Sequence, residues 1–260
     1  MSKTSALDPK ASCSHNAQRL LGESLEQFFK CLQAIPSSDD PELIRQARRA
    51  WRRYRVLWHL FQPVDTLGPP WADLSPLLKL LGLMRDLDVA RLETLPQRLK
   101  AAPLSPAYLW AQQALQELSD SARVQLIDQI AILQPPKLHH LTHWLAALQI
   151  KPQHPKSWAS ASAKKWVDAL TRSYEEAQIQ PFSAKRWHLV RLRAKRLRYG
   201  IEFLKPLLPH HLAAPWHHSA HQLQIRLGRE RDALRLTELL QCTACPPKRP
   251  PDSPPPPSCS

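Results

Sequence analysis

Glycine is scarce in this chain: only five of its 260 residues are glycine. Sheet-rich proteins need glycine in tight turns and bulges, so its scarcity argues against a mainly β fold. Leucine, alanine, glutamine and arginine are abundant instead, and these residues favour helices. The 26 prolines fall mostly between leucine-periodic segments and near the C-terminus, where they separate helices. The predicted fold class is therefore all-α.

Long apolar runs and a secretory signal are also lacking. No stretch approaches the roughly 20 apolar residues that a membrane-crossing helix requires, and the first residues contain no apolar signal region. The five cysteines are odd in number and scattered, which fits reduced thiols better than a disulfide framework. Cys242 and Cys245 have CxxC spacing, but no second Cys or His pair lies near them in sequence. We therefore expect a cytoplasmic protein with no membrane partner.

Acidic residues are few relative to basic ones. The chain has 22 Asp and Glu against 36 Lys and Arg, which gives a net charge of +14. A charge of this size attracts nucleic acid, polyphosphate or an acidic membrane surface. General solubility is the simpler explanation, so the choice depends on whether the charge is ordered.

The positive charge is ordered in two matching ladders. The first ladder is Arg45, Arg48, Arg52, Arg53, Arg55 and His59; the second, 143 positions later, is His188, Arg191, Lys195, Arg196, Arg198 and Glu202. Helix positions 0, 3, 7, 10 and 14 share a face about 80° wide. Each ladder is therefore expected to be a charged stripe on a helix with an apolar back. Two matched stripes suggest one extended polyanion rather than a small molecule.

Leucine periodicity and prolines divide the chain into elements. Helices are expected near 14–34, 41–61, 71–96, 106–133, 137–148, 157–178, 183–205 and 211–241. Asp40 is expected to cap the second helix, with Pro41 at its first position. Residues 1–13 are expected to be flexible and the proline-rich segment 242–260 to be disordered.

A shorter motif also occurs twice. Leu81-Gly82-Leu83-Met84-Arg85-Asp86 matches Leu227-Gly228-Arg229-Glu230-Arg231-Asp232, 146 positions later. A glycine inside a helix costs roughly 1 kcal/mol against alanine, so we expect close helix packing at Gly82 and Gly228. Asp86 and Asp232 are expected to accept from ladder arginines and hold them extended; the alternative is a solvated ion pair of little energetic value.

The ladders and the repeated motif together resemble the CHAD family, the conserved-histidine α-helical domains. The resemblance rests on the segment 188–199, on both Gly-x-x-Arg-Asp motifs and on the first ladder, and it covers roughly 14–241. It implies two four-helix-bundle-like repeats, about 14–133 and 137–241, related by pseudo-two-fold symmetry with a basic cavity between them. It also implies binding of inorganic polyphosphate without catalysis. We find no Glu-x-Glu-x-Lys strand of the CYTH type, so a standalone domain is expected.

The resemblance assigns anion-binding positions in this sequence. The predicted polyphosphate site comprises Arg45, Arg48, Arg52, Arg53, Arg55, His59, Arg85, His188, Arg191, Lys195, Arg196, Arg198, Arg229 and Arg231. One departure is Arg45, which stands where the first name-giving histidine is expected; it keeps the charge but puts pH sensitivity in question. Glu202, opposite His59 in the repeat, is a second asymmetry and is expected to pair with Arg198 one turn back.

Motifs for catalysis are not evident in the sequence. It has no glycine-rich phosphate loop, no nucleophile elbow and no paired acidic motif for two metals. His139 and His143 have metal-ligand spacing, but no third ligand follows. The histidines between 210 and 221 are expected to form a polar helix surface. We predict no enzyme, no cofactor and no metal.

The leading function is therefore non-catalytic binding of inorganic polyphosphate, with association to polyphosphate granules in the cytoplasm. The alternative is an RNA- or DNA-binding protein that uses the same basic surface. In that case Trp51, Trp58 and Trp187 would stack on bases, although packing is the more usual role of such residues. Nucleic acid is the weaker partner because the sequence contains no nucleic-acid motif.

Overall fold

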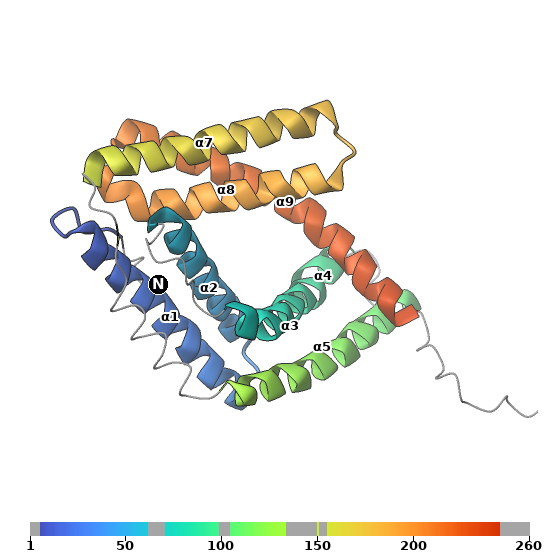
Figure 1. Ribbon diagram of the computed structural model, residues 1–260. Helices are drawn as coiled ribbons and strands as arrows, with labels where there is room; N and C mark the ends of the chain where they lie inside the picture. The colour runs from blue at the N-terminus through green and yellow to red at the C-terminus, as the bar shows by residue number, and fades with distance from the viewer. Residues whose placement is uncertain (1–5, 62–70, 99–104, 134–149, 151–154, 245–260) are drawn as a thin grey trace, which may run out of the picture.

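The computed structural model describes residues 6–61, 71–98, 105–133, 150 and 155–244 (Figure 1). Its elements are α1 (Cys13–Ala34), η1 (Ile35–Ser37), α2 (Pro41–Phe61), α3 (Trp71–Val89), the π-helical turn η2 (Ala90–Thr94), α4 (Leu95–Arg98), α5 (Pro106–Ile132), α7 (Pro155–Ile179), α8 (Ala184–Leu204), η3 (Lys205–Leu207) and α9 (His210–Ala244). No strand occurs in these ranges, so the all-α prediction is confirmed. The predicted helix at 137–148 and most of the proline-rich tail lie outside the described residues.

Helix starts follow local sequence signals. The Ser105 hydroxyl accepts a hydrogen bond from the Tyr108 N–H at 3.2 Å and caps α5. Asp40 accepts from the Glu42 N–H at 2.9 Å, and α2 begins at Pro41. The predicted cap of the second helix is therefore confirmed.

The helices pack around one large apolar core, and Ala177, Val190 and Leu227 form a smaller separate cluster between α7, α8 and α9. α1 packs along α2, α7 along α8, and α3 against α5. α2 crosses α8, and α9 packs on α8 near its start before it reaches α3, α5 and η2 (Figure 1). Tyr54 and Leu87 from the first half of the chain belong to the same core as Phe203 and Leu236 from the second. The two halves are therefore joined by burial and not only by the chain.

The two motif glycines have different surroundings. A methyl group on Gly82 would lie 2.9 Å from Nη1 of Arg48, whereas one on Gly228 would meet nothing within 4 Å. The predicted close packing is confirmed at Gly82 and wrong at Gly228. A glycine outside both motifs has the tightest contact, because a methyl group on Gly200 would lie 1.8 Å from the Trp166 ring. Gly200 therefore sets how closely α8 approaches α7.

Residues 1–13 were predicted to be flexible, and this is wrong for the described residues 6–13. Leu7 is buried, and its N–H donates to the Phe203 carbonyl at 3.2 Å. The Asp8 N–H donates to Oδ1 of Asn16 at 2.8 Å. One apolar side chain in a short polar segment is a weak sequence signal, yet Leu7 fills a core position at the end of α8.

Candidate polyanion-binding site

The crossing of α2 and α8 brings the two charged ladders together. The apolar backs of both helices, including Leu57 and Leu197, are buried in the core. Arg48 and Arg52 of α2 lie close enough to Arg191 and Lys195 of α8 for their charges to repel one another. We call the four side chains of Arg48, Arg52, Arg191 and Lys195 the inner cluster. They occupy matching positions of the two ladders.

Lys195 shows the largest electrostatic effect in the inner cluster. Burial, together with repulsion from Arg52, Arg191 and Arg48, lowers the pKa of Lys195 to about 6. Asp232 opposes this shift only in part. An amine with such a pKa is mostly neutral at pH 7, so the protein without ligand limits the charge that it concentrates here. A bound anion would favour the protonated amine.

Arg48 and Arg191 of the inner cluster are also desolvated. Burial lowers the pKa of Arg48, with Asp86 acting in the opposite direction, and it lowers the pKa of Arg191, with Asp232 acting in the opposite direction. Arginine remains charged at neutral pH, so its repulsion persists. Nε of Arg191 is buried and has no hydrogen-bond partner within the described part of the chain. The inner cluster therefore contains desolvated arginines, and Arg191 among them is incompletely satisfied.

The two motif aspartates affect the cluster mainly through charge. Asp86 accepts from Nε of Arg235 at 3.1 Å, and Arg235 also binds Glu238 at 3.0 Å. Burial raises the pKa of Asp232 against the influence of Arg191 and Lys195. The hydrogen bond that holds Asp86 thus comes from α9 and not from a ladder arginine, which differs from the predicted bracing. Arg235 was not predicted, because it lies outside both motifs.

Tyr199 holds two ladder arginines from different helices. Nη1 of Arg52 donates to its hydroxyl at 3.1 Å, and the Arg198 guanidinium lies 4.4 Å from its ring centroid. Burial would raise the pKa of Tyr199, but Arg52 and Arg198 outweigh it and lower that pKa. Tyr199 therefore positions both cations without neutralising them. It ends the segment that carried the family resemblance, yet it was not among the predicted binding residues.

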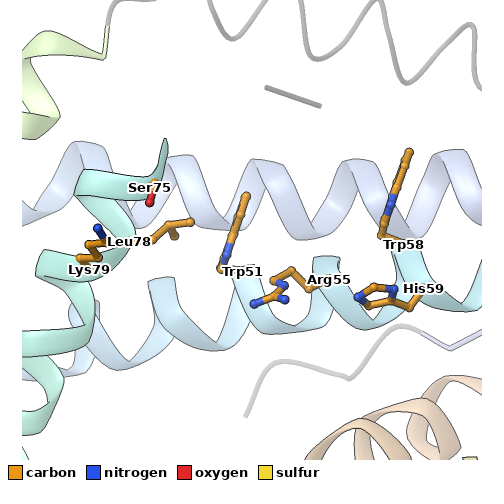
Figure 2. A pocket seen from close by; sticks show the side chains of 7 residues that line it. All are labelled: Trp51, Arg55, Trp58, His59, Ser75, Leu78 and Lys79. Atoms are coloured by element: carbon orange, nitrogen blue, oxygen red, sulfur yellow. The ribbon is translucent and has the colours of Figure 1, made fainter. Parts of the chain in front are cut away.

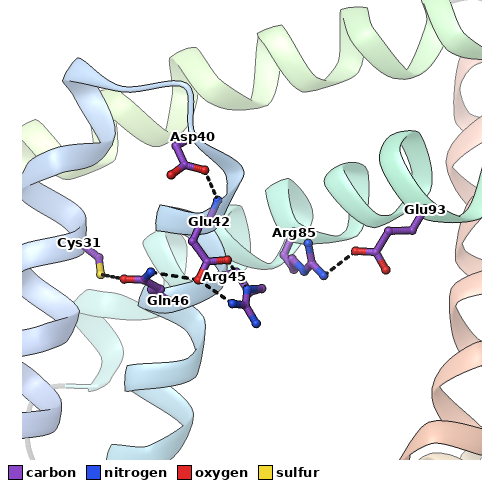
Figure 3. Close-up of polar contacts among 7 residues, drawn as sticks. All are labelled: Cys31, Asp40, Glu42, Arg45, Gln46, Arg85 and Glu93. Carbon is purple, nitrogen blue, oxygen red and sulfur yellow. Dashed lines mark hydrogen bonds and ion pairs between the residues drawn. The ribbon is translucent and has the colours of Figure 1, made fainter. Parts of the chain in front are cut away.

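The start of the first ladder is paired with acids (Figure 3). Arg45 forms an ion pair with Glu42 on the same helix, and this bond lowers the pKa of Glu42. Arg85 of α3 donates to Glu93 at 2.9 Å. Two predicted site residues, Arg45 and Arg85, therefore lie at the edge of the inner cluster with their own carboxylate partners.

Three further predicted residues lie near the start of the second ladder or on α9. Partial burial and the nearby Arg191, Arg231 and Lys195 lower the pKa of His188. Arg231 lies 3.4 Å from Glu238, and Arg229 is exposed on α9. His188 is thus electrostatically coupled to the inner cluster, whereas Arg229 lies at the exposed surface of α9.

Arg53 and Glu202 lie on another side of the crossing. The Arg53 guanidinium lies 5.1 Å from the ring centroid of Phe203. Glu202 lies 3.9 Å from Arg198, which confirms the predicted pairing, and 3.5 Å from Nε2 of His217. The carboxylate of Glu202 therefore reduces the positive charge at this end of the second ladder.

The far end of the first ladder forms a second basic group. Burial lowers the pKa of Arg196, and Arg55 lowers it further from α2. Burial, Arg196 and Arg55 likewise lower the pKa of His59. A pocket of about 520 Å³ opens beside this group (Figure 2). It is lined by Trp51, Arg55, Trp58, His59, Ser75, Leu78 and Lys79.

Metal clusters and membrane-spanning helices are both lacking in the described residues. These residues contain no group of three or more His, Cys, Asp or Glu side chains that could hold a metal ion. None of the described helices combines the length and apolar character needed to cross a membrane. The predicted histidine pair His139 and His143 lies outside the described residues.

Comparison with known proteins identifies the family. The sequence profile of the CHAD domain matches residues 19–241. The chain belongs to the CHAD family. Its CHAD fold is similar to the crystal structure of the CHAD domain from the plant Ricinus communis, with 27% identity and a TM-score of 0.78 over 93% of this chain and 82% of that chain. The resemblance drawn from the ladders and motifs is therefore confirmed.

The similarity to a second solved structure concerns only the fold. PptA from Streptomyces chartreusis has 22% identity and a TM-score of 0.60, over 93% of this chain and 89% of that chain. No curated protein sequence matches the chain.

Within this CHAD domain, the histidine position is kept at His188, while its counterpart Arg45 is bound to Glu42. The departure at Arg45 thus replaces a titratable group by an arginine that already has a carboxylate partner.

Proposed function

We propose that this CHAD domain binds inorganic polyphosphate along its two ladders and catalyses no reaction on it. The observation that supports this most is the inner cluster. Three arginines and one lysine from two helices are partly buried together, and the pKa of Lys195 is lowered to about 6. Concentrating desolvated like charges costs free energy, and a bound polyanion offsets that cost.

The geometry suits a phosphate chain because its donors are positioned before binding. Tyr199 holds Arg52 and Arg198, and the absence of a side chain at Gly82 leaves room for Arg48. Arginine presents a planar fork that matches two phosphate oxygens. A phosphate chain offers such oxygens at regular intervals and has no base edges to read. Donors fixed in this way lose less entropy on binding than flexible surface cations.

Competition calorimetry tests the proposal. Long-chain polyphosphate is titrated into the protein at fixed salt, and single- and double-stranded nucleic acids compete at matched phosphate concentration. Polyphosphate should bind much more tightly than either. Equal competition by nucleic acid would replace the proposal with general polyanion binding, and steady release of orthophosphate in proportion to protein would contradict the absence of catalysis.

The salt dependence adds an independent measure. Each neutralised phosphate contributes about 0.7 to 0.9 to the log–log slope of affinity against salt for nucleic acids. With both ladders engaged, on the order of six contacts are expected, which gives a slope of about 4 or more. A slope near one would mean that the ladders are not the site.

A further inference from the structure

The pocket beside the first ladder is built between α2 and the first half of α3. Trp51, Arg55 and Trp58 are four and three residues apart, so they share one face of α2. Leu78 and Lys79 of α3 close the other side. In Figure 2 the two tryptophans project in the same direction from α2, while Arg55 lies between them along the helix. Its volume of about 520 Å³ is typical of a small-molecule site.

The lining of this pocket has two chemical parts. Trp51, Trp58 and Leu78 make an apolar wall, and Trp51 is held by stacking on Tyr54 with ring centroids 5.6 Å apart. The second part is basic: Arg55 and Lys79 are cations, and His59 is an imidazole whose protonated form a bound phosphate would favour. None of the seven described residues that line the pocket is acidic. A ligand that satisfies both parts has a flat aromatic group attached to several negative charges.

Inorganic polyphosphate matches only half of this pocket, because it has nothing to place against the tryptophans. A nucleoside polyphosphate matches both parts, since its base is aromatic and its phosphates are anionic. The route from pocket to ladder is continuous, because Arg55 and His59 belong to both and Arg196 of α8 is close to each of them. We infer that this pocket binds the base of a nucleoside triphosphate, whose phosphates lie on Arg55, His59 and Lys79. The inference rests on the proposed function in that its phosphate half uses ladder residues.

The decisive experiment compares ATP with tripolyphosphate on the full chain. Both are titrated at constant ionic strength with a chelator and no divalent metal, and adenosine serves as the uncharged probe. Stacking of one base on an aromatic side chain makes ATP about 5- to 100-fold tighter than tripolyphosphate. Equal affinity of ATP and tripolyphosphate would overturn the inference, and so would binding of an oligoribonucleotide without binding of ATP.

Two variants locate the effect in the pocket. Trp58→Leu should remove the preference for ATP and leave tripolyphosphate binding unchanged, whereas Trp110→Leu, at a half-exposed position on α5, should leave the preference intact. Lys79→Ala keeps the core untouched, because this side chain is exposed. It should weaken ATP severalfold, and its control Lys165→Ala, exposed on α7, should not. If both Lys79→Ala and Trp58→Leu bind ATP like the unmodified protein, the pocket is not the site.

Failure of the pocket inference can be distinguished from failure of the proposed polyphosphate binding. Affinity for long-chain polyphosphate is measured in the same preparations, and it depends on the inner cluster rather than on Trp58. Loss of long-chain binding with a retained preference for ATP would refute the polyphosphate proposal alone. Long-chain binding with no preference for ATP would refute the pocket inference alone.

Discussion

The two ladder helices, α2 and α8, have nearly the same spacing of charge but different neighbours. On α2, Arg45 is bound to Glu42 within its own helix. On α8, the matching His188 is instead coupled to Arg191 and Lys195, and the far end carries Glu202 where α2 carries His59. Positive charge is thus reduced at the N-terminal end of one ladder and at the C-terminal end of the other.

The middle positions of the ladders behave alike, in contrast to the ends. Arg48 and Arg191 are both desolvated and each faces a motif aspartate. Arg52 and Lys195 follow one turn later, and both are coupled to the other ladder. Equal spacing within a helix therefore does not give equal function. What makes a ladder residue part of the site is its position at the crossing.

Paired substitutions in the two ladders should give the largest effect. Arg48→Ala with Arg52→Ala removes the α2 half of the inner cluster, and Arg191→Ala with Lys195→Ala removes the α8 half. Charge-assisted hydrogen bonds contribute about 1.5–3 kcal/mol each, so either pair should weaken long-chain polyphosphate binding at least about 100-fold. Titration calorimetry measures affinity and stoichiometry together.

The control for these pairs is Lys156→Ala with Lys165→Ala, which removes two exposed charges from α7 and should change affinity only slightly. If each ladder is an independent site, either pair would halve the stoichiometry and leave the affinity of the remaining site unchanged. That result would contradict a shared inner cluster.

The length of the phosphate chain should change affinity by an almost equal amount. Arg45 and Arg55 are ten positions apart, which is about 15 Å along the helix, so tripolyphosphate covers only part of the two ladders while a longer chain also reaches their ends. Binding to the remaining cations then occurs at high effective concentration, and affinity should rise by roughly 10² and then level off. Size-fractionated polyphosphates at constant ionic strength provide the measurement, and a flat series would exclude one continuous site.

The pH dependence of polyphosphate affinity should come from Lys195 and not from its arginine counterpart Arg52. Without ligand the pKa of Lys195 is about 6, and bound phosphate raises it, so binding takes up a proton between pH 6 and 8. Affinity should therefore rise as pH falls through that range, by up to about tenfold per pH unit, and level off below about 6. Calorimetry in buffers of different ionisation enthalpy counts the protons.

Lys195→Met should remove most of this dependence, while His188→Ala should remove a smaller part. Burial and nearby cations also lower the pKa of His188, so its contribution has the same sign. If Lys195→Met keeps the full pH dependence, the proton is taken up elsewhere.

The smallest predicted effect comes from the two motif glycines. Gly82→Ala would push against Arg48, so polyphosphate affinity should fall a few-fold. Gly228→Ala meets no neighbour, and it should stabilise α9 by about 0.5–1 kcal/mol without changing affinity. Thermal unfolding and calorimetry on both variants test this, and equal loss of affinity would show that Gly228 also makes room for the ligand.

Much of this architecture is readable from sequence because its signals are local. Prolines and serine or aspartate caps mark helix ends, as Asp40 and Pro41 do for α2. Regular spacing of arginines predicts a charged face, and it correctly identified Arg48, Arg52, Arg191 and Lys195 as neighbours within each ladder. The family resemblance then indicated that both ladders contribute to one site.

Long-range contacts escaped the same reasoning. Glu42, three residues earlier, gives Arg45 a local partner, but only the crossing of α2 and α8 makes Arg48 an inner residue. Arg235 lies outside every motif, yet it holds Asp86 across the molecule. The two motif glycines have the same local sequence spacing but different neighbours. Such differences depend on the angles between helices, which residue spacing does not encode.

The packing of α9 has a consequence for how this molecule can be divided. One helix of 35 residues packs on α8 and also on α3 and α5, and its Arg235 binds Asp86 of α3. A fragment that contains only one half would expose core surface and leave that carboxylate without Arg235. Matching motifs in the two halves therefore do not make them modules that can be exchanged, truncated or transplanted one at a time. Protein engineering must therefore transfer the whole domain, because α9 joins its two halves.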